Sequence, residues 1–93
     1  MELNELRGKI DAIDREITRL FDERMRISAE IAAYKRENRL PVLDVARERE
    51  KLCAVAESVR PEMREYTQNL YSAIFALSRG YQEALNTTQE KVN

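Results

Sequence analysis

Residues 3–34, LNELRGKIDAIDREITRLFDERMRISAEIAAY, determine the fold of this chain. Their first large aliphatic residues are spaced alternately three and four positions apart, at Leu3, Leu6, Ile10, Ile13, Ile17 and Leu20. This spacing places them along one side of a long amphipathic helix and predicts that the helix packs against other helices. The whole chain has only two glycines and two prolines, so we expect an all-α fold with three helices per chain.

The apolar stripe is interrupted at position 24. The next residue of the stripe is Arg24, and the pattern resumes at Ile27, Ile31 and Tyr34. A guanidinium on a helix-packing surface costs several kcal/mol unless an anion meets it. The sequence therefore predicts an anion beside Arg24, either a carboxylate of the protein or a bound ligand.

Breaks in the pattern divide the chain into three predicted helices. The first runs from about Leu3 to Glu37 and ends before Pro41, which disfavours helix at the preceding residue. The second spans roughly residues 45–59 with Asp44 as its N-cap, and the third begins at Pro61. Residues 86–93 are polar and without periodicity, which predicts a frayed tail or the start of a linker.

Composition argues against several classes of function. The formal net charge of −1 gives no general attraction to nucleic acid or to a membrane surface. With no histidine and one cysteine, Cys53, we expect neither a metal site nor a disulfide. The N-terminal MELNELRGK is unlike a signal peptide, and no apolar run could cross a membrane, so we expect a cytoplasmic location.

Several cations can share one site on the first helix. Arg24 and Lys35 are eleven residues apart and point the same way, about 16 Å apart along the axis. The small Ser28 between them leaves room for a ligand, although each cation could instead pair with a helix acid. The later helices add further polar candidates, namely Arg47, Glu48, Ser78 and Gln82.

Arg7 lies about 25 Å before Arg24 on the same helix and on another face. No metabolite-sized ligand could contact both arginines within one chain. If Arg7 is functional, it must serve a site on another subunit, as a twofold dimer would allow. A lone chain of this size buries only about 60–65% of its unfolded surface, which also favours a homodimer.

These candidates comprise fixed cations, one acid, an amide and a hydroxyl, without a Gly-rich phosphate loop or a nucleophile beside a base. Such a site is poorly suited to proton transfer or covalent catalysis. It can bind a small dianion in a reactive shape and stabilise charge that develops in the transition state.

With these residues at these spacings, the sequence resembles the all-helical chorismate mutases of the AroQ class. The resemblance rests on LRxKIDxID at 6–14, ERM at 23–25, AxxK at 32–35, PVxDxxRERE at 41–50 and LSRxYQ at 77–82. It implies a chorismate mutase domain over residues 1–85 and an intertwined helical homodimer without a cofactor. It also implies an isomerase activity, the rearrangement of chorismate to prephenate in phenylalanine and tyrosine biosynthesis.

The resemblance further implies a role for each candidate residue. Arg24 and the partner's Arg7 would hold the substrate carboxylates, helped by Arg47 and Ser78. Lys35 and Gln82 would donate hydrogen bonds to the ether oxygen. The ring hydroxyl would be bound by Glu48 and by the backbone near Asp44.

Two other functions remain open from the sequence. One is an isochorismate–pyruvate lyase with the same fold and a similar cationic pocket. The other is a non-catalytic helical module for dimerisation or regulation, in which Arg24 and Lys35 would be dispensable.

Overall fold

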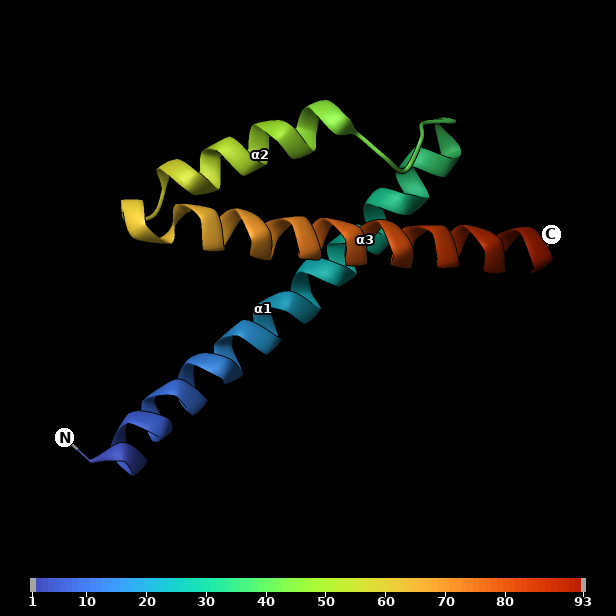
Figure 1. Ribbon diagram of the computed structural model, residues 1–93. Helices are drawn as coiled ribbons and strands as arrows, with labels where there is room; N and C mark the ends of the chain where they lie inside the picture. Colours follow the sequence, from blue (N-terminus) through green and yellow to red (C-terminus); the bar gives the residue numbers. More distant parts are fainter. Residues whose placement is uncertain (1, 93) are drawn as a thin grey trace.

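The structure is a computed structural model that describes the backbone of residues 2–92 and the side chains of residues 2–88. All regular structure in this range is helical: α1 (Leu3–Glu37), α2 (Val45–Glu57), the short 3₁₀ turn η1 (Pro61–Met63) and α3 (Arg64–Val92). Helix α3 packs against both α1 and α2. Figure 1 shows α2 running beside the first half of α3, while α1 crosses α3 at a steep angle. The predicted all-α fold with three helices is confirmed.

The loop between α1 and α2 is fixed by caps at both ends. Asp44 is the N-cap of α2, as predicted, and its carboxylate accepts a hydrogen bond from the Arg47 backbone N–H at 3.0 Å. At the end of α1, the N–H of Leu40 donates to the Lys35 carbonyl at 2.7 Å, and the N–H of Arg39 donates to the Arg36 carbonyl. This is a Schellman motif, and Arg39 occupies its left-handed position with φ of +56°.

Two predicted boundaries differ from the structure. Helix α2 ends at Glu57, two residues earlier than expected. Helix α3 continues through residues 86–92, where the sequence predicted a frayed tail or linker. No glycine or proline follows Gly80 to stop the helix, and the hydroxyls of Thr87 and Thr88 bond to the carbonyls of Glu83 and Ala84 one turn earlier.

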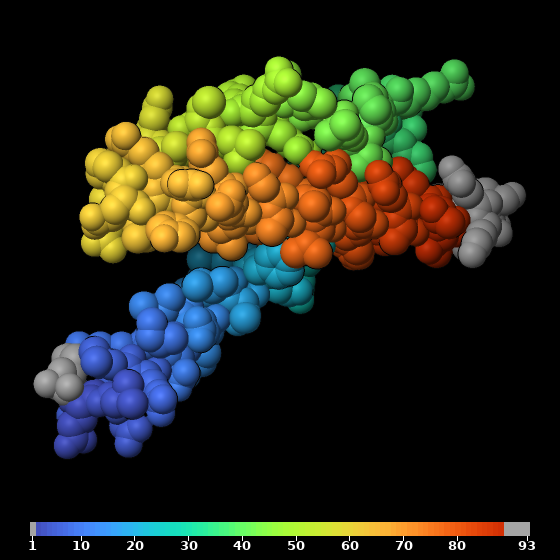
Figure 2. Space-filling model, in the orientation of Figure 1, coloured from blue at the N-terminus to red at the C-terminus, as the bar shows by residue number. Residues whose placement is uncertain are grey.

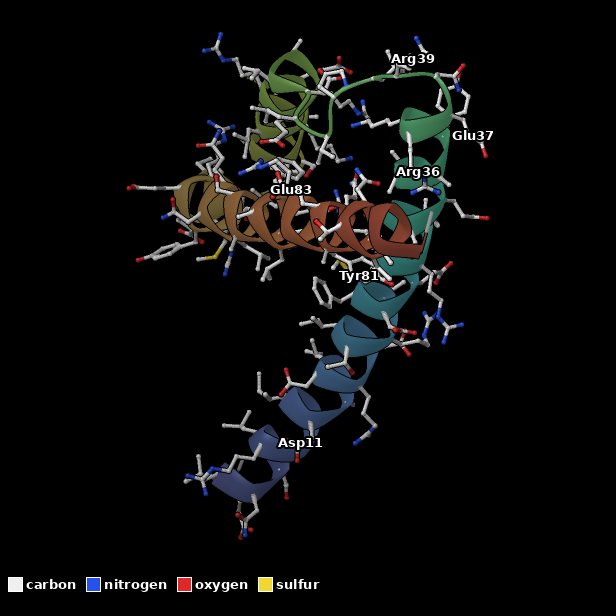
Figure 3. All side chains as sticks on the ribbon, turned by 90° about the vertical axis from the view of Figure 1, so that its right-hand side faces the viewer. Asp11, Arg36, Glu37, Arg39, Tyr81 and Glu83 are labelled. Carbon is white, nitrogen blue, oxygen red and sulfur yellow. The ribbon has the colours of Figure 1, made fainter. Side chains whose placement is uncertain are left out.

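The chain is thin, with extents of 57 × 27 × 14 Å, and has a small core. Among residues 2–88, the buried apolar residues are Ala32, Val55 and Phe75. The first half of α1 projects beyond the other helices (Figure 2), so its six large aliphatic residues are 45–59% exposed. Figure 3 shows Asp11 on this projecting half and Arg36 beside α3, where Arg36 donates a hydrogen bond to Asn86. The apolar stripe predicted to pack is therefore uncovered over residues 3–20.

Candidate active site

A cavity of about 410 Å³ lies between the C-terminal half of α1, the first half of α2 and the middle of α3. Seven of the eight residues predicted for the site line it: Arg24, Lys35, Asp44, Arg47, Glu48, Ser78 and Gln82. The other lining residues are Ile27, Ser28, Ile31, Val42, Lys51, Phe75 and Arg79. Residues more than 50 positions apart in the sequence thus face one space.

Arg7 is the predicted residue that does not reach this cavity. It is exposed on the projecting half of α1, among residues 2–20, which are all exposed. The cavity begins at Arg24, the lining residue nearest the N-terminus. Within one chain, Arg7 therefore takes no part in the site.

Arg24 lies at the edge of the cavity without a carboxylate of its own chain within ion-pair distance, among residues 2–88. Its guanidinium carbon lies 5.6 Å from the centre of the Phe75 ring, in a cation–π arrangement. Phe75 is buried and holds the guanidinium over an apolar surface. The sequence predicts either a protein carboxylate or a bound ligand beside Arg24. Within the described chain, no protein carboxylate takes that place.

Lys35 is held by the loop that follows α1. Its ammonium donates a hydrogen bond to the Val42 carbonyl at 2.8 Å. An ammonium has three hydrogens, so two remain for a ligand in the cavity. This contact orients the Lys35 side chain and removes the alternative of an ion pair with a helix acid in the described structure.

Three buried polar residues form a hydrogen-bonded chain across α1 and α3. The hydroxyls of Ser28 and Ser78 are 2.8 Å apart, and the Gln82 Nε2 donates to the Ser78 hydroxyl at 3.2 Å. The Gln82 Oε1 is buried and has no hydrogen-bond partner. A buried acceptor without a partner costs about 1–3 kcal/mol. The unpartnered Gln82 oxygen therefore lowers the stability of the fold, but it places a polar group in the interior beside the cavity.

The acids of the cavity are already engaged. The Arg79 guanidinium bonds to both carboxylate oxygens of Glu48, joining α3 to α2. The Asp44 carboxylate caps α2. Arg47 lines the cavity, but its guanidinium pairs with Glu50 at 3.2 Å on the exposed side of α2. That exposed pair contributes little to stability, so Arg47 can turn towards an anion at small cost.

Five cationic side chains and two carboxylates line the cavity, which gives it a surplus of positive charge in a chain whose net charge is −1. No group of three or more metal-ligating side chains occurs in the part of the chain that the structure describes. None of the helices described is both long and apolar enough to cross a membrane. The site is suited to a small anion bound by hydrogen bonds and charge.

Three polar residues of the cavity were not predicted as part of the site: Ser28, Lys51 and Arg79. Ser28 was interpreted as a spacer, yet its hydroxyl is buried and bonded. Lys51 lies one helical turn after Arg47. Arg79 lies three residues before Gln82, so helical spacing alone could have placed it near the site.

Comparison with known proteins agrees with this geometry. The family model described as chorismate mutase type II matches residues 6–83. A bifunctional chorismate mutase/prephenate dehydratase from Aquifex aeolicus (strain VF5) is 47% identical over 49 residues. That match covers 53% of this chain and 14% of the relative, so the chain corresponds to a small part of the larger protein. Because the family model covers most of the helical structure and the cavity, the chain belongs to the chorismate mutase type II family.

Proposed function

We propose that the chain catalyses the rearrangement of chorismate to prephenate and does so without a cofactor. The observation that carries the proposal is the convergence of Arg24, Lys35 and Gln82 on one cavity, where no acid among residues 2–88 pairs with either cation. Family membership supports the same reaction. Chorismate is a dianion of metabolite size, and the cavity has the volume and the positive charge for it.

The reaction needs no proton donor or base. The C–O bond of the enolpyruvyl ether breaks while a C–C bond forms to the ring, in one cyclic movement of electrons. Negative charge builds on the ether oxygen as the C–O bond lengthens. An enzyme can accelerate such a step by holding the substrate in a chair-like conformation and by placing donors at that oxygen.

Lys35 and Gln82 are the proposed donors to the ether oxygen. The Val42 carbonyl already orients the Lys35 ammonium. For Gln82, a half-turn of the amide exchanges Oε1 and Nε2. The Ser78 hydroxyl then donates a hydrogen bond to Oε1, so this oxygen no longer lacks a partner. The Nε2 group becomes free to donate to the substrate.

The other residues bind the groups that do not react. Arg24 holds one carboxylate, with Arg47 and Ser78 completing carboxylate recognition. The Glu48 carboxylate accepts a hydrogen bond from the ring hydroxyl, and the backbone near Asp44 completes recognition of that group. Cations are suited to the carboxylates because charge-assisted hydrogen bonds are short and strong.

We also propose that the enzyme is a homodimer in which Arg7 of the partner subunit completes each site. The exposed stripe on α1 supports this, because six aliphatic side chains 45–59% exposed form an apolar face too large for a lone chain. A second apolar hollow of about 370 Å³ lies between α1 and α3, with Ile17, Leu20, Leu70 and Ile74 in its wall. Residues 1–85 as the catalytic domain and the cytoplasmic location remain predictions within this proposal.

The direct test is loss of chorismate absorbance on adding the purified chain, with prephenate identified as the product. Lys35→Ala and Gln82→Ala should each lower turnover about a hundredfold or more. Gln68→Ala is the matched control, because Gln68 is on the same helix, bonds to the Leu52 carbonyl and does not line the cavity.

Other outcomes would replace the proposal. Pyruvate and salicylate formed from isochorismate, without turnover of chorismate, would indicate the lyase. No turnover of either substrate, with Arg24→Ala raising stability, would indicate a non-catalytic module.

A further inference from the structure

Arg79 and Glu48 form an ion pair unlike the others in the described chain. The remaining ion pairs join residues two to four positions apart, and their side chains are 59–80% exposed. The Arg79 and Glu48 side chains are 31% and 25% exposed, and the pair joins α3 to α2. Both residues line the cavity. Because of this location, the pair can affect substrate binding in the cavity as well as the stability of the fold.

One nitrogen of Arg79, Nη1, bonds to both oxygens of the Glu48 carboxylate. An ionised carboxylate has about four acceptor sites on its two oxygens. The Arg79 contact uses two of them and leaves others for a donor in the cavity. Glu48 can thus be held by Arg79 and still accept a hydrogen bond from a ligand.

We propose that Arg79 is a positioning residue that holds the Glu48 carboxylate where it accepts the hydroxyl hydrogen of the substrate ring. This inference rests on the proposed function, in which Glu48 binds that hydroxyl. A glutamate has three side-chain torsions, and a free one loses rotamer freedom when it binds a ligand. Arg79 fixes those torsions before the substrate arrives. The entropy cost of ordering Glu48 therefore does not weaken substrate binding.

The competing explanation is that the pair only fastens α2 to α3. In that case, removing Arg79 lowers stability but leaves recognition of the hydroxyl as it was. The two explanations differ in hydroxyl discrimination, defined as kcat/KM for chorismate divided by kcat/KM for the analogue lacking the ring hydroxyl. A fastening role changes the unfolding midpoint and does not change this ratio.

The test compares Arg79→Gln, Glu48→Gln and the double variant in the full chain. Glu48→Gln should reduce the hydroxyl discrimination about tenfold to a hundredfold, the range for a hydrogen bond to a charged group. Arg79→Gln should reduce it about tenfold or more. The double variant should fall no further than Glu48→Gln alone, because Arg79 acts through Glu48.

Arg79→Lys is a second variant that preserves the test if Arg79→Gln does not fold. A single nitrogen of Arg79 makes both contacts, and one ammonium with its three hydrogens can also contact both oxygens, so the discrimination should stay within about threefold of wild type. Arg26→Gln is the matched control, since it removes the exposed Arg26–Asp22 pair outside the cavity and should leave the ratio unchanged.

The outcomes separate this inference from the proposed function. A wild-type chain that does not consume chorismate overturns both. An active wild type with a folded Arg79→Gln variant of unchanged discrimination overturns the role of Arg79 alone. An Arg79→Lys variant that loses all hydroxyl discrimination also overturns the role of Arg79 alone. Loss in Arg79→Gln, rescue in Arg79→Lys and no further loss in the double variant support it.

Discussion

The Lys35 ammonium donates a hydrogen bond to the Val42 carbonyl oxygen, 2.8 Å away, and so ties the end of α1 to the loop before α2. The backbone of Lys35 is held as well, because its carbonyl accepts from the Leu40 N–H at 2.7 Å. The side chain proposed to donate to the ether oxygen is therefore oriented before substrate binds. Such preorganisation is the main source of electrostatic catalysis, since no reorganisation is needed during the reaction.

Replacing this donor should greatly reduce turnover, whereas losing its hydrogen bond to the Val42 carbonyl should lower stability by only about 0.5–1.5 kcal/mol. We expect Lys35→Met to lower kcat about a hundredfold or more, because the methionine keeps the apolar stem and loses the charge. Chorismate consumption by the folded variant measures the effect. Arg49→Met is a suitable control, since Arg49 is exposed and outside the cavity lining. A Lys35→Met enzyme with near-normal kcat would exclude Lys35 as a transition-state donor.

The left-handed position at Arg39 offers a stability prediction. A side chain at φ of +56° is strained, whereas glycine adopts this conformation freely. We expect Arg39→Gly to stabilise the fold by about 0.5–1 kcal/mol, measured as a higher urea midpoint at a fixed chain concentration. Glu37→Gly, inside the last turn of α1, should destabilise it by about 1 kcal/mol. Equal effects of the two substitutions would mean that the Schellman motif does not form.

The exposed stripe of α1 predicts a partner copy. Ile13 is 54% exposed in the single chain, so a charge there would be harmless in a monomer. We expect Ile13→Glu to shift sedimentation from dimer to monomer and to lower the unfolding temperature, because a dimer would bury the new carboxylate. Thr18→Glu, away from the stripe, should leave the dimer intact. A dimer that tolerates Ile13→Glu would place the interface elsewhere.

The proposed donors predict a flat pH profile. The chain has no histidine, and the neutral amide of Gln82 donates a hydrogen bond without any change of protonation. We expect kcat to vary little between about pH 6 and pH 8, measured by initial rates in constant ionic strength. A steep rise towards acid would require a protonated carboxyl group as donor and would rule out this role for Gln82.

Local pattern predicts the three helices and half of the residues that line the cavity. The spacing of apolar residues fixed α1, and helical geometry placed Arg24 and Lys35 on one side of it. The cap at Asp44 followed from its position just before the second helix. These features depend on residues within a few turns of each other, which a sequence shows directly.

The features that the sequence did not predict depend on contacts between helices. The sequence predicts Glu48 as a binder of the ring hydroxyl but does not show that it is bonded to Arg79, which lies on another helix 31 positions away. The Ser28–Ser78 hydrogen bond likewise joins residues 50 positions apart. The end of α3 was misplaced for a different reason, since an absence of apolar periodicity does not stop a helix that meets no glycine or proline.

The measurement that tests the account most directly mixes two inactive variants, Arg7→Ala and Arg24→Ala. If each site takes Arg24 from one subunit and Arg7 from the other, every mixed dimer regains one intact site. Random reassociation of equal amounts should then restore about one quarter of the wild-type turnover of chorismate. A mixture no more active than the average of its two parents would contradict a site shared between subunits.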